Sequence, residues 1–134
     1  EANRGVNGID GQLATFLGLA RAGEEAWCVL GDLTALYDLA APWILSQREG
    51  LRGRIVIINN SGGQIFSRVF KNDLFVNKHG IGFEHWARMW NLGYQRWTEI
   101  PRALEPARGI EVVELVPDEA SSRRFWDRYD ALWS

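Results

Sequence analysis

The fold is decided by the stretch Ile55-Val56-Ile57-Ile58-Asn59-Asn60-Ser61-Gly62-Gly63-Gln64, in which four β-branched residues run directly into a polar, glycine-rich turn. A short apolar run that ends in turn residues is typical of a strand buried on both faces. The earlier stretch Ala26-Trp27-Cys28-Val29-Leu30-Gly31-Asp32-Leu33-Thr34 has the same arrangement, and Ile110–Val116 is a third apolar run. The sequence therefore predicts a parallel sheet whose strands lead into polar loops.

Helical periodicity in the remaining segments predicts an α/β fold, a parallel sheet flanked by helices, in a single domain of residues 1–134. The segment Arg68–Gly82 has no clear period and is predicted to be a lid or binding loop. The predicted helices are one that starts after Asp10 and ends at Gly23, one from about Thr34 to Ser46 that Pro42 interrupts, Phe83–Leu92, Thr98–Glu105 capped by Thr98, and a last helix capped by Ser121 or Ser122.

Composition excludes several classes of protein. With 134 residues, 46% of them hydrophobic, the chain is long enough to bury one ordinary core. The formal charge of -2 provides no basic excess for nucleic acid or for a membrane surface. The apolar runs are far shorter than the roughly 20 residues of a membrane-spanning helix. We therefore expect a cytoplasmic protein, in which the lone Cys28 is a buried, inert thiol.

Oxygen-bearing side chains follow two of the predicted strands where those strands end. Ligands of parallel α/β sheets bind beyond the carboxyl ends of the strands, so both loops are expected at one edge. Asp32 would supply a carboxylate, Asn60 an amide oxygen and Gly62 a backbone carbonyl, which suit Mg²⁺ together with diphosphate oxygens and water. Gly62 and Gly63 would let the backbone approach the phosphates closely.

Simpler interpretations of the same residues stay open at this point. Asp32 and Thr34 would serve equally well as caps of the following helix, with residues 59–63 forming a tight turn. His79 and His85 are the only histidines, and neither adjoins a nucleophile, so we interpret them as surface or packing residues. No residue of the chain is assigned a catalytic role.

Taken together, the two loops resemble the thiamine diphosphate motif, which has Gly-Asp-Gly at one strand end and Asn-Asn at a later one. Leu33 takes the place of the second glycine, and that departure is typical of one branch, the synthases of menaquinone biosynthesis. The opening Asn3-Arg4-Gly5-Val6-Asn7-Gly8-Ile9-Asp10-Gly11 and the later Gly82-Phe83-Glu84-His85 support the same resemblance, which is weaker from Tyr94 onward. It implies the fold of a thiamine diphosphate-binding domain.

The resemblance also implies roles for individual residues. Asp32, Asn60 and Gly62 would hold Mg²⁺ or Mn²⁺, and Arg4, Ile65 and Phe66 would line the substrate site. An arginine suits a dicarboxylate substrate because its guanidinium pairs bidentately with a carboxylate. The residues implied to contact thiamine diphosphate are Ile9, Gly31, Asp32, Leu33, Thr34, Asn60, Gly62, Gly63 and Ile65.

Members of this family decarboxylate 2-oxoglutarate and add the succinyl unit to isochorismate, a transferase reaction that the resemblance implies for the parent enzyme. A glutamate that activates the cofactor would come from a separate pyrimidine-binding domain, usually of a neighbouring subunit in a homo-oligomer. The chain opens on Glu1 and its only methionine is Met89, so we expect an inactive C-terminal fragment of that enzyme. Two alternatives remain: a domain of another thiamine diphosphate-dependent decarboxylase or carboligase, and a non-catalytic binding or oligomerisation module.

Overall fold

The computed structural model describes residues 8–70 and 72–132 of the chain. Helices and strands alternate along it, as the apolar runs predict. In chain order the elements are α1 (Gln12–Leu19), β1 (Glu25–Gly31), α2 (Asp32–Tyr37), the 3-10 helix η1 (Ala41–Gln47), β2 (Arg52–Ile58), α3 (Gln64–Phe70), the 3-10 turn η2 (Asp73–Phe75), α4 (Glu84–Met89), β3 (Gly93–Trp97), β4 (Ile110–Leu115) and α5 (Glu119–Ala131).

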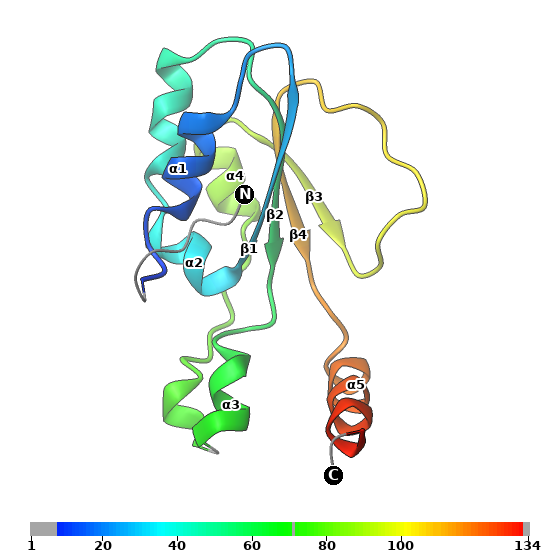
Figure 1. Cartoon of the computed structure of the whole chain (residues 1–134). Helices are drawn as coiled ribbons and strands as arrows, with labels where there is room; N and C mark the ends of the chain where they lie inside the picture. The colour runs from blue at the N-terminus through cyan, green and yellow to red at the C-terminus, as the bar shows by residue number, and fades with distance from the viewer. Residues whose placement is uncertain (1–7, 71, 133–134) are drawn as a thin grey trace.

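The strands form one parallel sheet in the order β1-β2-β4-β3, and all of them point the same way in Figure 1. The register aligns Val29 of β1 with Val56 of β2 and Val113 of β4. This sheet confirms the predicted α/β class. Because β1 and β2 are parallel neighbours, the loops that follow them open at the same edge.

The strand order explains why the two faces of the sheet differ. The chain crosses the sheet in one direction from β1 to β2 and on to β3, and then returns from β3 to β4. Because crossover connections are right-handed, the forward connections lie on one face and the return connection on the other. Figure 1 shows α1, α2 and α4 together on one side, while the loop 98–109 bulges from the opposite side.

The hydrophobic core lies between the helix-covered face of the sheet and its helices. The fully buried side chains that the sheet contributes to this core are Ile55, Ile57 and Val112. They belong to the same cluster as Leu13 and Leu17 of α1. Phe83 and Trp86 meet edge to face, with ring centroids 6.0 Å apart, and bring α4 into the same cluster. Burial of these side chains fixes the strands whose ends carry the polar loops.

Arg54 of β2 organises the opposite face of the sheet. Its guanidinium pairs with Glu25 at 2.9 Å and with Glu111 at 3.2 Å, and lies 5.0 Å from the ring centroid of Trp27. It also donates to the carbonyl oxygen of Glu105, which ties the loop 98–109 to the sheet. A buried guanidinium needs such paired acceptors, so this network holds the face that no helix covers.

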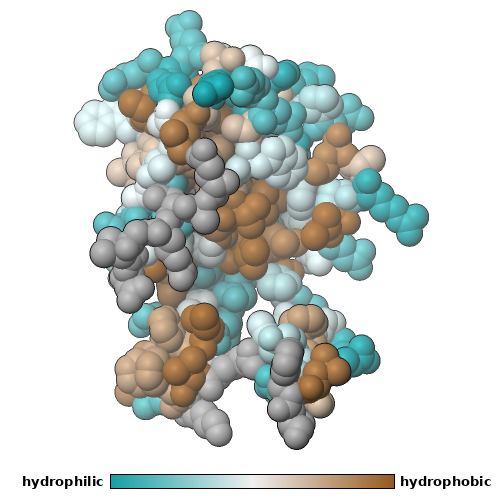
Figure 2. Space-filling model, viewed as in Figure 1, coloured by the Kyte–Doolittle hydropathy of each residue, from teal (hydrophilic) through white to brown (hydrophobic). Residues whose placement is uncertain are grey.

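Apolar side chains remain exposed on this face and on the two helices beyond the carboxyl edge. Val29 of β1 is 63% exposed and Trp27 is 45% exposed. Figure 2 shows apolar residues gathered on the face of the sheet and on the two lobes below it, which Figure 1 identifies as the α3 region and α5. No residue of α5 is buried. Among residues 8–70 and 72–132, each helix is too short or too polar to be a candidate membrane span.

Two predictions between residues 90 and 109 are wrong. The predicted helix Phe83–Leu92 ends earlier, at Met89, and Gly93 begins strand β3, because residues 93–97 pair along the far edge of β4. Residues 98–105 do not form the predicted helix and belong to the loop that Arg54 ties down. Pro101 and Pro106 disfavour helical backbone at the residues that precede them, Ile100 and Glu105, which argues against a continuous helix here.

Other boundaries differ in their details. The predicted helix from about Thr34 to Ser46 is interrupted, but not at Pro42: α2 ends at Tyr37, and Pro42 lies in the first turn of the 3-10 helix η1. The last helix is capped by Asp118, whose Oδ1 accepts the N–H of Ser121 at 2.7 Å, and not by Ser121 or Ser122. Cys28 is half-buried, whereas we predicted a buried thiol. The segment Arg68–Gly82 contains the end of α3 and η2 before its irregular part.

Candidate functional site

The loops after β1 and β2 meet at the carboxylate of Asp32. This side chain is 2% exposed and lies at the first residue of α2. Its Oδ1 accepts the N–H of Leu33 at 2.7 Å, and its Oδ2 accepts the N–H of Gly62 at 2.8 Å. Asp32 therefore binds an N–H in the first turn of its own helix and joins the two loops. The simpler interpretation of Asp32 and Thr34 as caps is wrong, because Gly31 is the N-cap of α2 and no side chain makes a cap hydrogen bond there.

The second loop is tightly packed around its glycines. Ser61 has a φ of 64° and Gly62 a φ of 127°, so the turn passes through the left-handed region. A Cβ on Gly62 would lie 2.5 Å from the carbonyl oxygen of Val76, and the N–H of Gly63 donates to that same oxygen at 2.6 Å. Only glycine fits at position 62, and the loop is fixed against the segment around Val76.

Asn59 is buried, and its side chain holds the loop after β2 in place. Its amide donates to Glu114 at 2.7 Å and to the carbonyl oxygen of Ile81 at 2.9 Å, while its Oδ1 accepts the N–H of Ser61. Glu114 also accepts the N–H of Phe83 and the hydroxyl of Tyr94. Glu114 of β4 therefore links the asparagine loop to the start of α4 and to β3.

These contacts shift the acidities of the two ionisable partners. Burial alone would raise the pKa of Glu114, but hydrogen bonds from Phe83, Tyr94 and Asn59, with the charge of Arg96, outweigh it and hold the pKa below its ordinary value. Burial, followed by the hydrogen bond to Glu114, raises the pKa of the Tyr94 hydroxyl. The cluster therefore contains an ionised carboxylate and a neutral phenol at neutral pH.

Asp38, a residue that our sequence analysis did not single out, fixes the segment before α1. Its two oxygens accept the N–H groups of Gly11 at 2.6 Å and Leu13 at 2.7 Å. This contact ties residues 11–13 to the end of α2. Ile9, two residues before Gly11, is 38% exposed. Arg4, predicted to line the substrate site, lies outside the described residues.

The other predicted residues lie near the strand ends. Gly31 ends β1, and a Cβ built there would meet no atom within 4 Å. Asn60 is exposed. Ile65 and Phe66 lie in the first turn of α3 and are also exposed, with the rings of Phe66 and Phe70 stacked at a centroid distance of 6.0 Å. Leu33 and Thr34 follow Asp32 in the first turn of α2.

His79 belongs to this site, although we predicted a surface or packing residue. Its side chain is 11% exposed, and its Nε2 lies 3.3 Å from Oδ2 of Asp32. No local pattern indicates this contact, because the two residues lie far apart in the sequence. His85, by contrast, is exposed on α4, in agreement with the surface interpretation.

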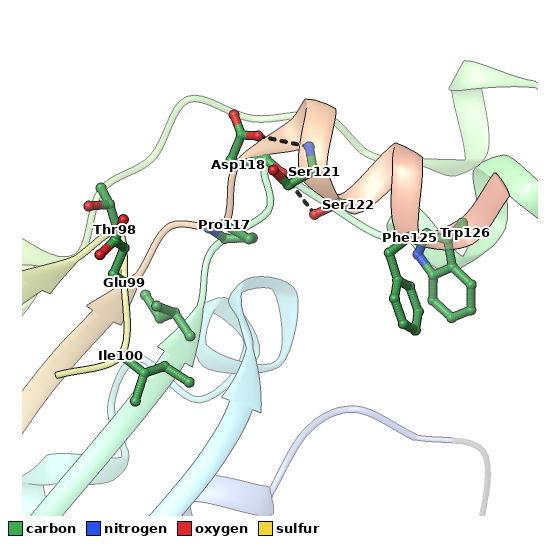
Figure 3. A pocket seen from close by; sticks show the side chains of 10 residues that line it. Thr98, Glu99, Ile100, Pro117, Asp118, Ser121, Ser122, Phe125 and Trp126 are labelled. Atoms are coloured by element: carbon green, nitrogen blue, oxygen red, sulfur yellow. Dashed lines mark hydrogen bonds between the residues drawn. The ribbon is translucent and has the colours of Figure 1, made fainter. Parts of the chain in front are cut away.

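The pocket drawn in Figure 3 lies elsewhere, between the ends of β3 and β4 and the start of α5. Its volume is about 490 Å³, and its lining includes Ile100, Pro117, Phe125 and Trp126. The view shows Asp118 binding the first turn of α5 beside it. None of the predicted site residues lines this pocket.

The donor set at these loops fits a hard cation and a diphosphate. The described residues contain no group of three or more His, Cys, Asp or Glu side chains that would hold a metal. A cation here would therefore depend on Asp32, on amide and carbonyl oxygens, and on ligand oxygens, which is how Mg²⁺ commonly binds. Within the described part of the chain, no Lys or Arg is paired with the buried Asp32 carboxylate, so it can accept a cation.

Comparisons with known proteins complete the description of this site. No family model matches the chain. It is 51% identical over 134 residues to the 2-succinyl-5-enolpyruvyl-6-hydroxy-3-cyclohexene-1-carboxylate synthase of Bdellovibrio bacteriovorus, covering 98% of this chain and 26% of that protein. It is 33% identical over 137 residues to the protein of that name from Akkermansia muciniphila, covering 92% of this chain and 25% of that protein. The chain spans about a quarter of these relatives.

Proposed function

Since the chain belongs to the family of 2-succinyl-5-enolpyruvyl-6-hydroxy-3-cyclohexene-1-carboxylate synthases, we propose that residues 1–134 are the diphosphate-binding domain of such an enzyme. The parent enzyme would decarboxylate 2-oxoglutarate and transfer the succinyl unit to isochorismate. The observation that carries this proposal is the buried Asp32 carboxylate, held at 2.8 Å by Gly62 where the two loops meet.

Asp32, the Asn60 amide and the Gly62 carbonyl would hold Mg²⁺ or Mn²⁺. Asp32 supplies the negative charge, and its burial strengthens its attraction for a cation because little water screens it. The Gly62 carbonyl accepts the N–H of Gln64 at 2.9 Å, and its second lone pair is left for a metal. Diphosphate oxygens and water would complete the coordination.

Thiamine diphosphate, when bound, supplies the carbanion chemistry for decarboxylation and carbon–carbon bond formation. The open space at Gly31 leaves room for its diphosphate, with Leu33, Thr34 and Gly63 beside it. Ile9 and the exposed Ile65 would give the cofactor an apolar surface and keep water from the reacting atoms.

The substrate would lie on the side of α3. Phe66, exposed in its first turn, would contact it together with Ile65. Arg4 would pair bidentately with a carboxylate of the 2-oxo acid. We assign no catalytic acid or base to this chain, and we propose that the activating glutamate belongs to the pyrimidine-binding domain of a neighbouring subunit in a homo-oligomer.

The full-length parent enzyme provides the direct test. We expect turnover of 2-oxoglutarate with isochorismate, and a loss of about 100-fold or more in affinity for Mg²⁺ with thiamine diphosphate in Asp32→Asn. Asp127→Asn, on the exposed surface of α5, is the matched control and should bind normally. Turnover of pyruvate in place of 2-oxoglutarate would instead favour another decarboxylase or carboligase.

The isolated chain should be catalytically silent and bind thiamine diphosphate weakly. It spans about 26% of its relative, and we propose that the remaining contacts come from the rest of the enzyme. Calorimetric titration with Mg²⁺ and thiamine diphosphate measures this directly. A dissociation constant on the order of 1 μM would show that this domain suffices.

A further inference from the structure

His79 carries a buried donor that the described residues leave without a hydrogen bond. Its Nδ1 accepts the N–H of Ile81 at 3.2 Å, so in the neutral ring the proton is on Nε2. That Nε2 is fully enclosed and has no hydrogen-bond partner, although Oδ2 of Asp32 is only 3.3 Å away. A buried donor in this state is costly unless a small movement or a ligand satisfies it.

The segment that carries His79 is fixed to the glycine loop. Val76 is fully buried and accepts the N–H of Gly63, and the close approach of Gly62 to residues 76 and 77 leaves no space for a Cβ. The His79 ring is therefore held beside Asp32 by the same contacts that shape the loop after β2.

The hydrogen bonds of Asp32 indicate how the nearby His79 ring affects its two carboxylate oxygens. Oδ2 accepts the N–H of Gly62 and faces Nε2 of His79, whereas the only hydrogen bond to Oδ1 among the described residues comes from the N–H of Leu33. Each carboxylate oxygen has two lone pairs. A small movement that completes the His79 bond would give Oδ2 two donors and leave Oδ1 as the oxygen with a lone pair for a cation.

We propose that His79 is a positioning residue for Asp32: its Nε2–H holds Oδ2 and thereby presents Oδ1 to the divalent cation. This inference rests on the proposed function, since it requires Asp32 to bind that cation. Residues that hold a metal ligand in place commonly change metal affinity when they are replaced, although they do not touch the metal.

The test measures binding of Mn²⁺ to the full-length parent enzyme at saturating thiamine diphosphate, from the electron paramagnetic resonance signal of free Mn²⁺. We expect His79→Leu to weaken Mn²⁺ binding by about 10- to 100-fold. His79→Gln places an amide N–H near the position of Nε2 and should stay within about 3-fold of wild type. His85→Leu, on the exposed surface of α4, is the matched control and should bind normally.

Asp32→Asn and thermal unfolding of the ligand-free proteins separate the outcomes. Normal binding by His79→Leu alongside lost binding by Asp32→Asn would overturn the role of His79 and leave the proposed function intact. Normal binding by Asp32→Asn would overturn the proposed function itself. Equal weakening in the Gln and Leu variants, with equal losses of melting temperature, would show a merely structural role. If His79→Leu does not fold, His79→Asn takes its place, because its shorter amide does not reach Oδ2.

Discussion

The backbone N–H of Gly62 donates a hydrogen bond of 2.8 Å to Oδ2 of Asp32, and so joins the loops after β1 and β2. The bond depends on a conformation that a side chain at position 62 would not allow. Its φ of 127° is strained for any other residue, and a Cβ would lie 2.5 Å from the carbonyl oxygen of Val76.

Gly62→Ala should therefore destabilise the chain by about 2 kcal/mol or more, because both backbone strain and the clash must be relieved. Gly18→Ala is the matched control. Gly18 lies within α1, and a Cβ there would meet no atom within 4 Å, so alanine should stabilise the chain by about 0.5–1 kcal/mol. Urea denaturation measures the free energy of unfolding of both variants. Similar changes in that free energy would contradict the tight packing at Gly62.

Glu114→Gln should destabilise the chain by about 2–3 kcal/mol at neutral pH, because it weakens charge-assisted hydrogen bonds in a buried site. Glu119→Gln, an exposed residue paired with Arg123, should change stability by no more than about 0.5 kcal/mol. Denaturation with urea at pH 7 compares them.

We also predict that the effect of Glu114→Gln on stability depends on pH. The pKa of Glu114 in the folded chain lies below its ordinary value of 4.5. Its contribution is therefore complete above pH 4.5 and is lost as the pH falls through the folded-state pKa. The difference in stability between wild type and Glu114→Gln should shrink as the pH falls through that range, and a constant difference would be inconsistent with the lowered pKa.

Arg54→Met should cost about 3–5 kcal/mol, because it leaves Glu25 and Glu111 without their shared cation. It should also release the loop 98–109, which the guanidinium binds through the carbonyl of Glu105. Hydrogen exchange of residues 103–109 measures that release. Arg88→Met removes an exposed pair with Glu84 on α4 and should cost about 0.3–0.5 kcal/mol with no change in this loop.

Cys28 should react slowly with a disulfide reagent in the folded chain. Burial, followed by the charge of Asp38, raises the pKa of its thiol from 9.0 to about 11. At pH 8 the folded chain then holds about 100-fold less thiolate than the unfolded chain, and the thiolate is the reacting species. The check is to compare the rate of reaction of the Cys28 thiol in buffer with its rate in concentrated urea. Equal rates would show that folding does not change the reactivity of the thiol.

The sequence predicts those parts of the fold that short-range patterns determine. The apolar runs at residues 26–30, 55–58 and 110–116 became β1, β2 and β4. Of these, β2 and β4 lie in the middle of the sheet, whereas β1 is an edge strand with Trp27 and Val29 exposed. Strand β3, Gly-Tyr-Gln-Arg-Trp, pairs only with β4 at the edge of the sheet and stays partly exposed, so it lacks such a run. Asp118 followed by Glu119 was an N-cap signal that the sequence analysis missed.

Some residues of the candidate site could likewise be predicted from short-range patterns, and others could not. Asp32 and Asn60 stand out because Asp32 directly follows β1 and Asn60 lies two residues after β2, at the carboxyl ends of neighbouring parallel strands. Asp38, His79 and Glu114 do not, because their roles arise from partners more than 20 residues away that only the folded sheet brings close. Capping rules, which describe neighbours three or four residues apart, contain no information on such contacts.

The parallel pairing of the sheet also has a kinetic consequence. In the ladders, Glu25 meets Arg52 and Gly53 meets Ile110, so no two neighbouring strands form a hairpin. Each pairing must close a long loop before it gains any stabilisation, which places such a chain among the slower-folding topologies. Asp32 and Gly62 follow directly on β1 and β2, and they can meet only once those strands have paired. The contact between the two candidate ligand-binding loops therefore forms only after the slow pairing of these strands.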